Sequence, residues 1–227
     1  MSCIRFISPL YFRHSCTKMR AVIKVIASLC CGFLIAPATY AHSTLLEQPA
    51  AYQQCAACHG PAAQGNAQLN APALAGLSER YLSRQLINFK TGMRGSHEQD
   101  TLGQQMQAMM KPLSIDKDIP ELAAYLAKLV PAQQGAQLKG DLTNGTRYYQ
   151  GKCGACHGGT AQGNEALNAP RLAGQSNDYL KRQMRNFATG LRGTHADDKY
   201  GRQMAMMAKT TSGKELDDIL YYISLQE

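Results

Sequence analysis

Two short segments of this 227-residue chain carry residues suited to cofactor chemistry: "CAACHG" at 55–60 and "CGACHG" at 153–158. Each segment places two thiols three residues apart and an imidazole directly after the second thiol. A Cys pair at this spacing occurs in thiol redox centres, in structural zinc sites and at sites of covalent haem attachment. The rest of the sequence has to distinguish these three kinds of chemistry.

Haem attachment is the chemistry that accounts for every residue of the two segments. A redox Cys pair of the thioredoxin type needs alternating strands and helices and gives no role to the following His. A structural zinc site needs four closed ligands, and each copy has only one further His, His97 or His195, far downstream. Two thiols on one helical turn can instead add to the two vinyl groups of a porphyrin, which holds the adjacent His under the iron. We therefore predict two covalently bound haem c groups, attached through Cys55 and Cys58 with His59 as iron ligand, and through Cys153 and Cys156 with His157 as iron ligand.

Residues 1–41 have the pattern of an export signal. They contain five Lys or Arg, no acidic residue, and an apolar run at 25–36 that is too short to span a bilayer. Cleavage is expected after Ala41, with Ala38 as the alternative, and Met19 opens a compact leader of its own as an alternative start to Met1. We therefore expect a periplasmic protein with a leader at 1–41.

The leader also accounts for most of the net charge of the chain. The formal charge of the whole chain is +8 at pH 7, but the residues after 41 contain 19 basic and 16 acidic side chains. They have no clustered basic run, so a nucleic-acid-binding protein is excluded. Of eight Cys, four lie in the leader and four in the two Cys-x-x-Cys-His segments, so none is left for a separate structural disulfide.

The chain after the leader is a tandem repeat. Residues 55–114 and 153–212 align without a gap at a spacing of 98 and are identical at 35 of 60 positions, which indicates two copies of one domain. A segment rich in Gln and Gly separates the copies. We predict the first domain at 42–131, a linker at 132–140 and the second domain at 141–227.

Apolar residues recur at helical spacing in both copies, and no alternating run long enough for a sheet competes with them. The chain contains no Trp and few Phe, so each copy has a thin core of its own that a porphyrin would complete. One helix per copy is predicted from Leu82, Leu86 and Phe89, and from Leu180, Met184 and Phe187. A last helix is predicted from Ile119, Leu122, Leu126 and Leu129, capped by Asp118 with Glu121, and from Leu216, Ile219 and Ile223, capped by Ser212 with Glu215.

Each copy also has a Met-rich segment that offers a second ligand to the iron. Met106 and Met109 in copy one recur as Met204 and Met207 in copy two. A Met sulfur opposite a His nitrogen gives an electron-transfer haem of raised potential, whereas most Met residues in helices only fill the core. The repeat alone leaves both Met positions of each copy open.

These motifs together resemble the dihaem cytochrome c4 family. The pattern is C-x-x-C-H, then NAP-x-LAG, then YL-x-RQ-x-x-NF-x-TG-x-RG, then a Met eight residues before a Ser, and a final amphipathic helix. It covers nearly the whole chain after the leader and occurs twice. The resemblance implies an all-α fold of two tandem class I cytochrome c domains, each wrapped around one covalent haem.

The resemblance also implies the remaining site residues. In the family the axial Met lies eight residues before the Ser or Thr at the start of the last helix, which selects Met106 and Met204. A Pro after the haem motif offers its carbonyl to the axial His, a role that carries over to Pro72 and Pro170 and raises the basicity of the His. One departure is Thr211, where the family usually has Leu.

Two further groups of polar residues recur in both copies. His97 and His195 stand in polar, Gly-containing segments and are interpreted as loop residues in solvent. Arg binds carboxylates with two hydrogen bonds, so the recurring arginines are candidates for the haem propionates, although ordinary helix-surface charge is the simpler account of at least one pair. These pairs are Arg84 with Arg182, and Arg94 with Arg192.

We expect a periplasmic electron carrier rather than an enzyme, passing single electrons between redox partners of a respiratory chain. The expected partners are a membrane quinol-oxidising complex, a terminal oxidase or a periplasmic dehydrogenase, and peripheral association with a membrane is compatible with these. One alternative is a cytochrome subunit of a larger dehydrogenase or oxidase complex. Another is a haem enzyme with an open iron site, which the recurrence of the Met segments in both copies argues against.

Overall fold

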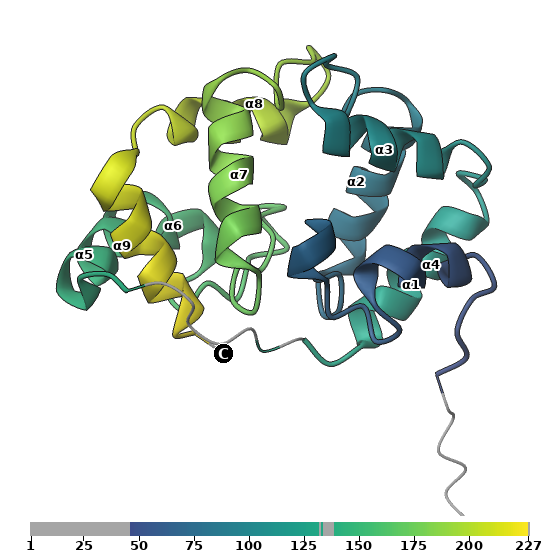
Figure 1. Cartoon of the computed structure of the whole chain (residues 1–227), viewed down its shortest axis with the longest axis horizontal. Coiled ribbons are helices and arrows are strands. Elements are labelled where there is room, and N and C mark those ends of the chain that lie inside the picture. The colour runs from purple at the N-terminus through teal and green to yellow at the C-terminus, as the bar shows by residue number, and fades with distance from the viewer. Residues whose placement is uncertain (1–45, 132, 134–138, 227) are drawn as a thin grey trace, which may run out of the picture. The chain divides into compact units, whose positions relative to one another are not determined.

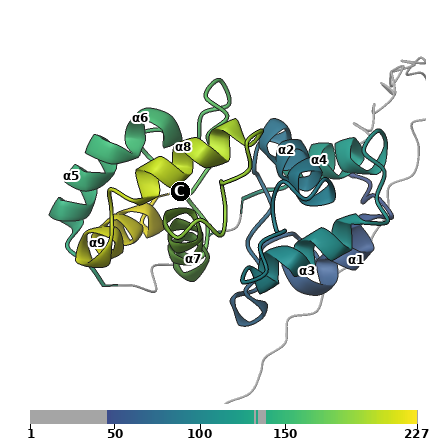
Figure 2. The same ribbon diagram turned by 90° about the horizontal axis from the view of Figure 1, so that it is seen from above.

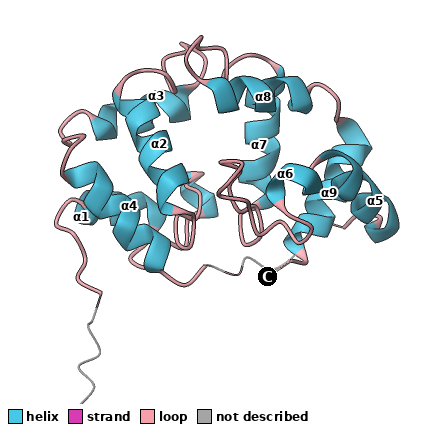
Figure 3. Ribbon diagram, turned by 180° about the vertical axis from the view of Figure 1, so that it is seen from behind, coloured by secondary structure: helices cyan, strands magenta, loops and turns pink. Residues whose placement is uncertain are grey.

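The computed structural model describes residues 46–131, 133 and 139–226. The predicted leader and most of the predicted linker lie outside these residues, so the cleavage site, the start and the domain boundaries stay predictions. Every regular element of the described part is a helix (Figure 3), and its two isolated β-bridges, Asn66 with Ala71 and Asn164 with Ala169, form no sheet. The predicted all-α fold is confirmed. No helix of this part is long and apolar enough to cross a membrane.

The helices follow the repeat. Those of copy one gather in one group and those of copy two in another (Figures 1 and 2). Copy one contains α1 (Tyr52–His59), the 3-10 turn η1 (Ala67–Leu69), α2 (Glu79–Lys90), α3 (Thr101–Met110) and α4 (Asp118–Lys128). Copy two contains α5 (Leu142–Lys152), α6 (Gly154–His157), α7 (Asn177–Ala188), α8 (Lys199–Ala208) and α9 (Gly213–Ser224).

The core of copy one is formed by α2 with α3 and α4, which pack against it. The apolar face predicted for α2 is buried, since Leu82, Leu86 and Phe89 are each less than a tenth exposed. The face of α4 is sealed more completely, with Ile119 and Leu122 fully buried. Burial of such a face, rather than helix propensity, supplies most of the stability of short helices.

The core of copy two joins α9 to both α5 and α7. Leu216, Ile219 and Ile223 lie on the buried face of α9, as the helical spacing predicts. On α7, Leu180 and Phe187 are buried and Met184 is only partly covered. The same two amphipathic helices therefore form the frame of both copies.

The predicted capping boxes of the two last helices are wrong. Helix α4 begins at Asp118 rather than after it, and Asp118 instead exchanges hydrogen bonds with Ser114: its Oδ2 accepts from the Ser114 N–H at 2.7 Å, and its own N–H donates to Ser114 Oγ at 3.1 Å. Helix α9 does begin directly after Ser212, but the Ser212 side chain makes no cap hydrogen bond. The carboxylate of Glu215 is paired with Lys152, which removes it from the cap. In both copies an acidic side chain of the predicted box has a partner other than the one that the cap requires.

Candidate haem sites

In each site, the two thiols and the imidazole lie on or directly beside one helix. In copy one, Cys55, Cys58 and His59 all belong to α1. In copy two, Cys153 lies at the junction of α5 and α6, and Cys156 and His157 belong to α6. Since residues three apart share a helix face, the two sulfurs of each copy are available to one flat ligand. All four of these cysteines are free thiols.

The environment of the first thiol of each pair is unsuited to thiol redox chemistry. Burial raises the pKa of Cys55 and of Cys153 to about 11 in each case. The thiolate is the reactive form of Cys, and redox cysteines have lowered pKa values. A redox pair at these positions is therefore disfavoured.

The imidazole of each site is oriented by a backbone carbonyl. His59 Nδ1 donates to the carbonyl oxygen of Pro72 at 2.8 Å, and His157 Nδ1 donates to that of Pro170 at 2.9 Å. Both rings are buried, which lowers the pKa of each His and favours the neutral form that a metal ligand requires. With Nδ1 engaged, Nε2 is the nitrogen left to bind a metal.

Each imidazole lines a cavity whose size suits a cofactor. The cavity of copy one measures about 390 Å³ and that of copy two about 600 Å³, within the usual range for cofactor sites. The structure brings all the predicted site residues of a copy to one cavity. Cys55, Cys58, His59, Pro72 and Met106 line the first, and Cys153, Cys156, His157, Pro170 and Met204 line the second.

The Met-rich helices α3 and α8 close the side of each cavity. Each is fixed at its start by an Asp cap, since Asp100 Oδ1 accepts from the Gly103 N–H at 3.0 Å and Asp198 Oδ1 from the Gly201 N–H at 2.9 Å. The Gly of each Arg-Gly pair lies against the same turn: a Cβ on Gly95 would come within 2.3 Å of the Gly103 carbonyl oxygen. Only Gly allows this approach, which sets the position of the Met helix relative to the Arg-Gly loop.

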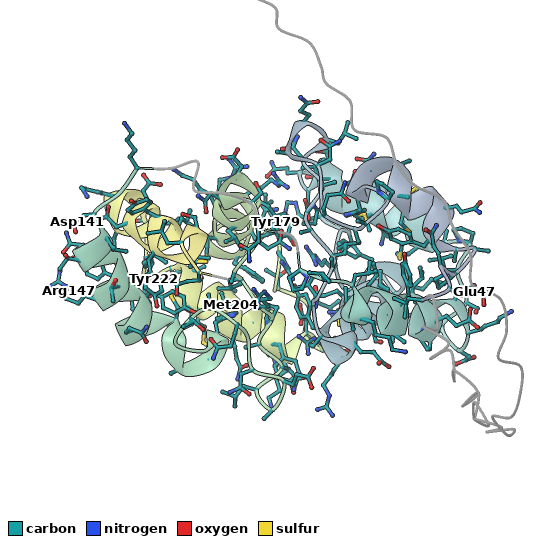
Figure 4. The ribbon with its side chains drawn as sticks, turned by 90° about the horizontal axis from the view of Figure 1, so that it is seen from below. Glu47, Asp141, Arg147, Tyr179, Met204 and Tyr222 are labelled. Carbon is teal, nitrogen blue, oxygen red and sulfur yellow. The ribbon has the colours of Figure 1, made fainter. Side chains whose placement is uncertain are left out.

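The environments of the Met residues differ between the copies. In copy one Met110 is 1% exposed and belongs to the core, while Met106 and Met109 are partly buried beside it. In copy two Met206 and Met207 are 65% and 40% exposed, and Met204 is the most covered of the three. Met204 is labelled in Figure 4. Copy two thus favours Met204 over Met207, and copy one leaves Met106 and Met109 both at the cavity.

A cluster of two arginines and two glutamines joins the copies. Gln85 Oε1 accepts from Arg94 at 2.7 Å and from Arg192 at 2.8 Å. Gln183 Oε1 accepts from the same two guanidinium groups, at 3.2 and 2.7 Å. Arg94 also lies 3.5 Å from the hydroxyl of Tyr179, which Figure 4 places where the two groups of helices meet. The cluster is nearly symmetric because each member has its counterpart 98 residues away.

The charges of this cluster fit a haem. Within the described part of the chain, neither Arg94 nor Arg192 forms an ion pair with a carboxylate. Arg192 is only 8% exposed, and its Nε has no hydrogen-bond partner. A buried cation without an anion is costly, and both arginines line the cavities, where haem propionates would supply the missing carboxylates. The residues present therefore fit the predicted cofactor.

The second pair of arginines also binds across the repeat. Arg84 donates to the side-chain and main-chain oxygens of Asn168 at 2.8 and 2.9 Å, and Arg182 donates to the same atoms of Asn70 at 3.0 and 2.8 Å. Neither pair of arginines is a simple helix-surface charge, contrary to the expectation for at least one of them. His97 and His195, by contrast, are exposed in loops, as expected.

Sequence reasoning missed the polar partners of these arginines. Gln85 and Gln183 stand in the repeated block "RQ", and a Gln that recurs on the face of an amphipathic helix is a signal of buried hydrogen bonding. Two other features have no counterpart in copy one and gave no signal. These are the ion pair of Lys152 with Glu215 and the buried side chain of Gln175.

The chain is similar to known cytochromes over most of its length. The family model "Cytochrome c" matches it twice, at residues 49–130 and 142–226. Cytochrome c4 of Azotobacter vinelandii is 33% identical over 179 residues, covering 74% of this chain and 82% of the relative. A thiosulfate dehydrogenase electron acceptor of Thiomonas intermedia is 35% identical over 188 residues, covering 77% and 78%.

Solved structures give the same result. The crystal structure of reduced recombinant cytochrome c4 from Pseudomonas stutzeri matches with a TM-score of 0.64 at 30% identity, covering 78% of this chain and 95% of that one. A thiosulfate dehydrogenase from Marichromatium purpuratum matches with a TM-score of 0.62 at 28% identity, covering 76% of this chain and 36% of that one.

Proposed function

Because this chain belongs to the cytochrome c family, with two domains of the cytochrome c4 type, we propose that it carries electrons in the periplasm from a dehydrogenase to an acceptor of the respiratory chain, without itself transforming a substrate. The predicted tandem cytochrome c fold, the two covalent haem c groups and the electron-transfer function are confirmed by the paired family match and the cytochrome c4 relatives. Haem c, when bound, supplies an iron that cycles between the ferric and ferrous states.

The proposed iron ligands are His59 with Met106 and His157 with Met204. Two observations support this assignment. The His and the Met of each copy line the same cavity. The hydrogen bond of each His uses Nδ1 and leaves Nε2 free to bind iron. A sixth ligand in both copies closes the metal to small molecules, which suits a carrier and not an enzyme.

The other residues of each site orient the imidazole and shape the cavity. Pro72 and Pro170 fix the imidazole tautomer and increase its electron donation. The apolar walls of the cavities exclude water, and Arg94 and Arg192 bring positive charge to the side where the copies meet.

A dehydrogenase is the donor that the relatives favour. The Thiomonas intermedia relative is named as the electron acceptor of a thiosulfate dehydrogenase, and the Marichromatium purpuratum structure is itself a thiosulfate dehydrogenase. The second of these also favours the alternative of a cytochrome subunit within a larger complex. Reduction of the purified protein by an added thiosulfate dehydrogenase, in the presence of thiosulfate, tests the donor. Copurification with a dehydrogenase at a fixed ratio would support the subunit instead.

The Met ligands are tested by four single variants: Met106→Ala and Met204→Ala, with Met109→Ala and Met207→Ala as matched controls. Each of the first two should abolish about half of the weak red-edge absorption that Met-ligated ferric haem gives, because one of two irons loses its Met. The controls should leave the band intact. A band that keeps its full intensity in Met106→Ala and is halved in Met109→Ala would transfer the ligand of copy one to Met109. Rapid binding of carbon monoxide by the unmodified protein would overturn the carrier in favour of an enzyme.

A further inference from the structure

One buried side chain of copy two binds the backbone of copy one beside the His59 site. Gln175 is 6% exposed and precedes α7. Its Oε1 accepts from the N–H of Ala73 at 3.1 Å, and its Nε2 donates to the carbonyl of the same residue at 2.5 Å. The amide orientation follows from the chemistry, since the Ala73 N–H can be satisfied only by an oxygen.

The group that Gln175 binds is the one that orients His59. The N–H of Ala73 and the carbonyl of Pro72 are the two ends of one peptide group, and that carbonyl accepts from His59 Nδ1 at 2.8 Å. A hydrogen bond accepted from a peptide N–H polarises the group and makes its carbonyl a stronger acceptor. Gln175, the Pro72–Ala73 peptide and His59 therefore form a chain of three polar groups, two in copy one and one in copy two.

Copy two has no equivalent of this chain. Its His157 donates to Pro170 at 2.9 Å, so the last bond is the same. The N–H that shares a peptide with the Pro170 carbonyl belongs to Arg171, and it has no hydrogen-bond acceptor among the residues that the structure describes. The repeat position of Gln175 in copy one is Leu77, an apolar residue in the core. The contact thus runs in one direction, from copy two to copy one.

We propose that Gln175 is a positioning residue for the His59 site: through the Pro72–Ala73 peptide it strengthens the hydrogen bond of His59 Nδ1 and selectively stabilises the ferric state in copy one. A stronger bond gives the imidazole more anionic character, and a more basic ligand favours the higher oxidation state. Docking of copy two therefore lowers the reduction potential of the first haem and not of the second. The proposal rests on His59 being an iron ligand, as proposed above.

The test replaces Gln175 by Met, which keeps its length, and by Leu, which is the residue of copy one. Both variants remove the polarising bond. The first haem should become roughly threefold easier to reduce relative to the second, which is about 28 mV at 59 mV per tenfold change. Potentiometric titration measures this shift, and the potential of the second haem should stay the same. In the reduced, ¹⁵N-labelled variants, the His59 Nδ1 proton should move upfield while that of His157 does not.

A control variant separates polarisation from a general loosening of the contact between the copies. Asn168→Gly removes the side-chain acceptor of Arg84 without touching the Pro72–Ala73 peptide, and Gly tolerates the left-handed backbone at this position. It should leave the His59 proton unmoved. If Asn168→Gly reproduces the effect of Gln175→Met, or if both haems shift together, the proposal is overturned.

The unmodified protein supplies a test that needs no variant to fold. Its His59 Nδ1 proton should resonate downfield of the His157 Nδ1 proton in the reduced state, because only the first acceptor is polarised. Equal positions, or the reverse order, would overturn the proposal while His and Met ligation of both irons remained intact. Absence of His ligation in copy one would instead defeat the proposed function, and absorption spectra of the same sample distinguish the two failures.

Discussion

The helix that delivers the first Cys differs between the two copies, while the contacts around the His are the same. Tyr52 lies three residues before Cys55, and Tyr149 lies four before Cys153. Both tyrosine hydroxyls nevertheless donate to the carbonyl of the Gly after the His, each at 2.7 Å. Copy two absorbs the extra residue by breaking the helix, so that α5 ends at Lys152 and α6 begins at Gly154. The local backbone therefore differs between the copies, while the hydrogen bond from Tyr to the Gly carbonyl is the same in both.

The last helix shifts in step with the first. Four residues separate Ser114 from Ile119 in copy one, and three separate Ser212 from its counterpart Leu216 in copy two. As a result Tyr222 reaches Tyr149, with ring centroids 4.8 Å apart, just as a Tyr of α4 reaches Tyr52 at 5.3 Å. The Tyr of the first helix and the Tyr of the last helix therefore keep their contact in both copies, although both are shifted by one residue relative to the central part. Close packing explains this, because a shift in one helix alone would leave voids at the other.

The copies also differ in charge beside the thiols. Lys152, which directly precedes Cys153, is paired with Glu215 of α9 and donates to the carbonyl of Thr210 at 2.8 Å. Copy one has Gln54 in the place of Lys152. In copy two, an ion pair therefore links the start of the last helix to the Cys segment. In copy one, the start of the last helix is instead stabilised by the local hydrogen bonds between Ser114 and Asp118.

The largest expected effect comes from replacing both thiols of one site by Ser, and it should be the same in both copies. Cys55→Ser with Cys58→Ser, and Cys153→Ser with Cys156→Ser, should each reduce the covalent haem from two per chain to one. The pyridine haemochrome spectrum, taken after extraction of non-covalent haem with acidic acetone, measures this number. Two haems in either double variant would contradict the attachment assigned to that copy.

Acid should distinguish the copies, because only copy two has a buried carboxylate in its last helix. Asp218 is 2% exposed, and hydrogen bonds from Lys214 and from the Asp141 N–H hold its pKa below the ordinary value, whereas its counterpart Glu121 is exposed. A lowered folded pKa means that the ionised form stabilises the fold. This contribution is complete above the unfolded value of about 3.9 and is lost as the pH falls through the folded pKa.

The measurement for Asp218 is urea unfolding between pH 7 and pH 3. Asp218→Asn should lower the midpoint at pH 7, and its difference from the unmodified protein should shrink below about pH 4. Asp217→Asn is the control, since the ion pair of Asp217 with Lys181 is exposed and contributes little. A difference that stays constant over the whole pH range would show that the carboxylate charge of Asp218 is not the cause.

The two tyrosine hydroxyls should contribute equally despite their different sequence spacing. Tyr52→Phe and Tyr149→Phe each delete one hydrogen bond to a Gly carbonyl, at a cost of about 1 kcal/mol. Urea unfolding of the two variants, followed by helical circular dichroism, measures the loss. A loss confined to one copy would mean that the shifted helix of copy two is not equivalent to α1.

Most of the site residues and helix faces could be predicted from the internal repeat. Residues kept in both copies, such as His59 with Pro72, turned out to line the cavities, because duplication preserves the positions on which a shared site depends. Helix faces followed from the spacing of Leu and Ile, since burial dominates the stability of short helices. The capping box of copy two failed because a sequence pattern for a cap gives no account of partners far away in the chain, such as Lys152 for Glu215. In copy one the partner of Asp118 is the nearby Ser114, and the pattern placed the start of the helix at the wrong residue.

Contacts between the copies could not be predicted from the repeat. Gln175 has no counterpart, and its partner Ala73 is 102 residues away and uses only backbone atoms. The role of the arginines was left open for a related reason: a charged residue on an amphipathic helix has the same spacing whether it faces solvent or another domain. Periodicity predicts which face of a helix is buried within its own domain. It does not specify which residues of the other domain that helix will contact.

The smallest expected effect concerns the exposed faces of the Met helices, where the copies differ in charge. Lys199 and Arg202 of α8 are exposed, and their counterparts in α3 are Thr101 and Gln104. Positive charge near an iron disfavours its ferric form, so the second haem should have the higher potential as far as these charges act. At roughly 15 Å in the dielectric of water, each charge contributes about 0.3 kcal/mol before screening by salt.

Substituting the residues of copy one, Lys199→Thr with Arg202→Gln, should therefore lower the potential of the second haem by at most about 24 mV, taking 59 mV per tenfold change in the equilibrium constant. The first haem should shift less, because it is farther from α8. Potentiometric titration at low and high ionic strength measures both effects, and the difference between the double variant and the unmodified protein should narrow as salt is added. A shift that is independent of salt would assign the effect to a change in packing of α8 rather than to charge. An unchanged potential would show that the field of these two side chains does not reach the iron of copy two, and a rise would contradict the predicted sign.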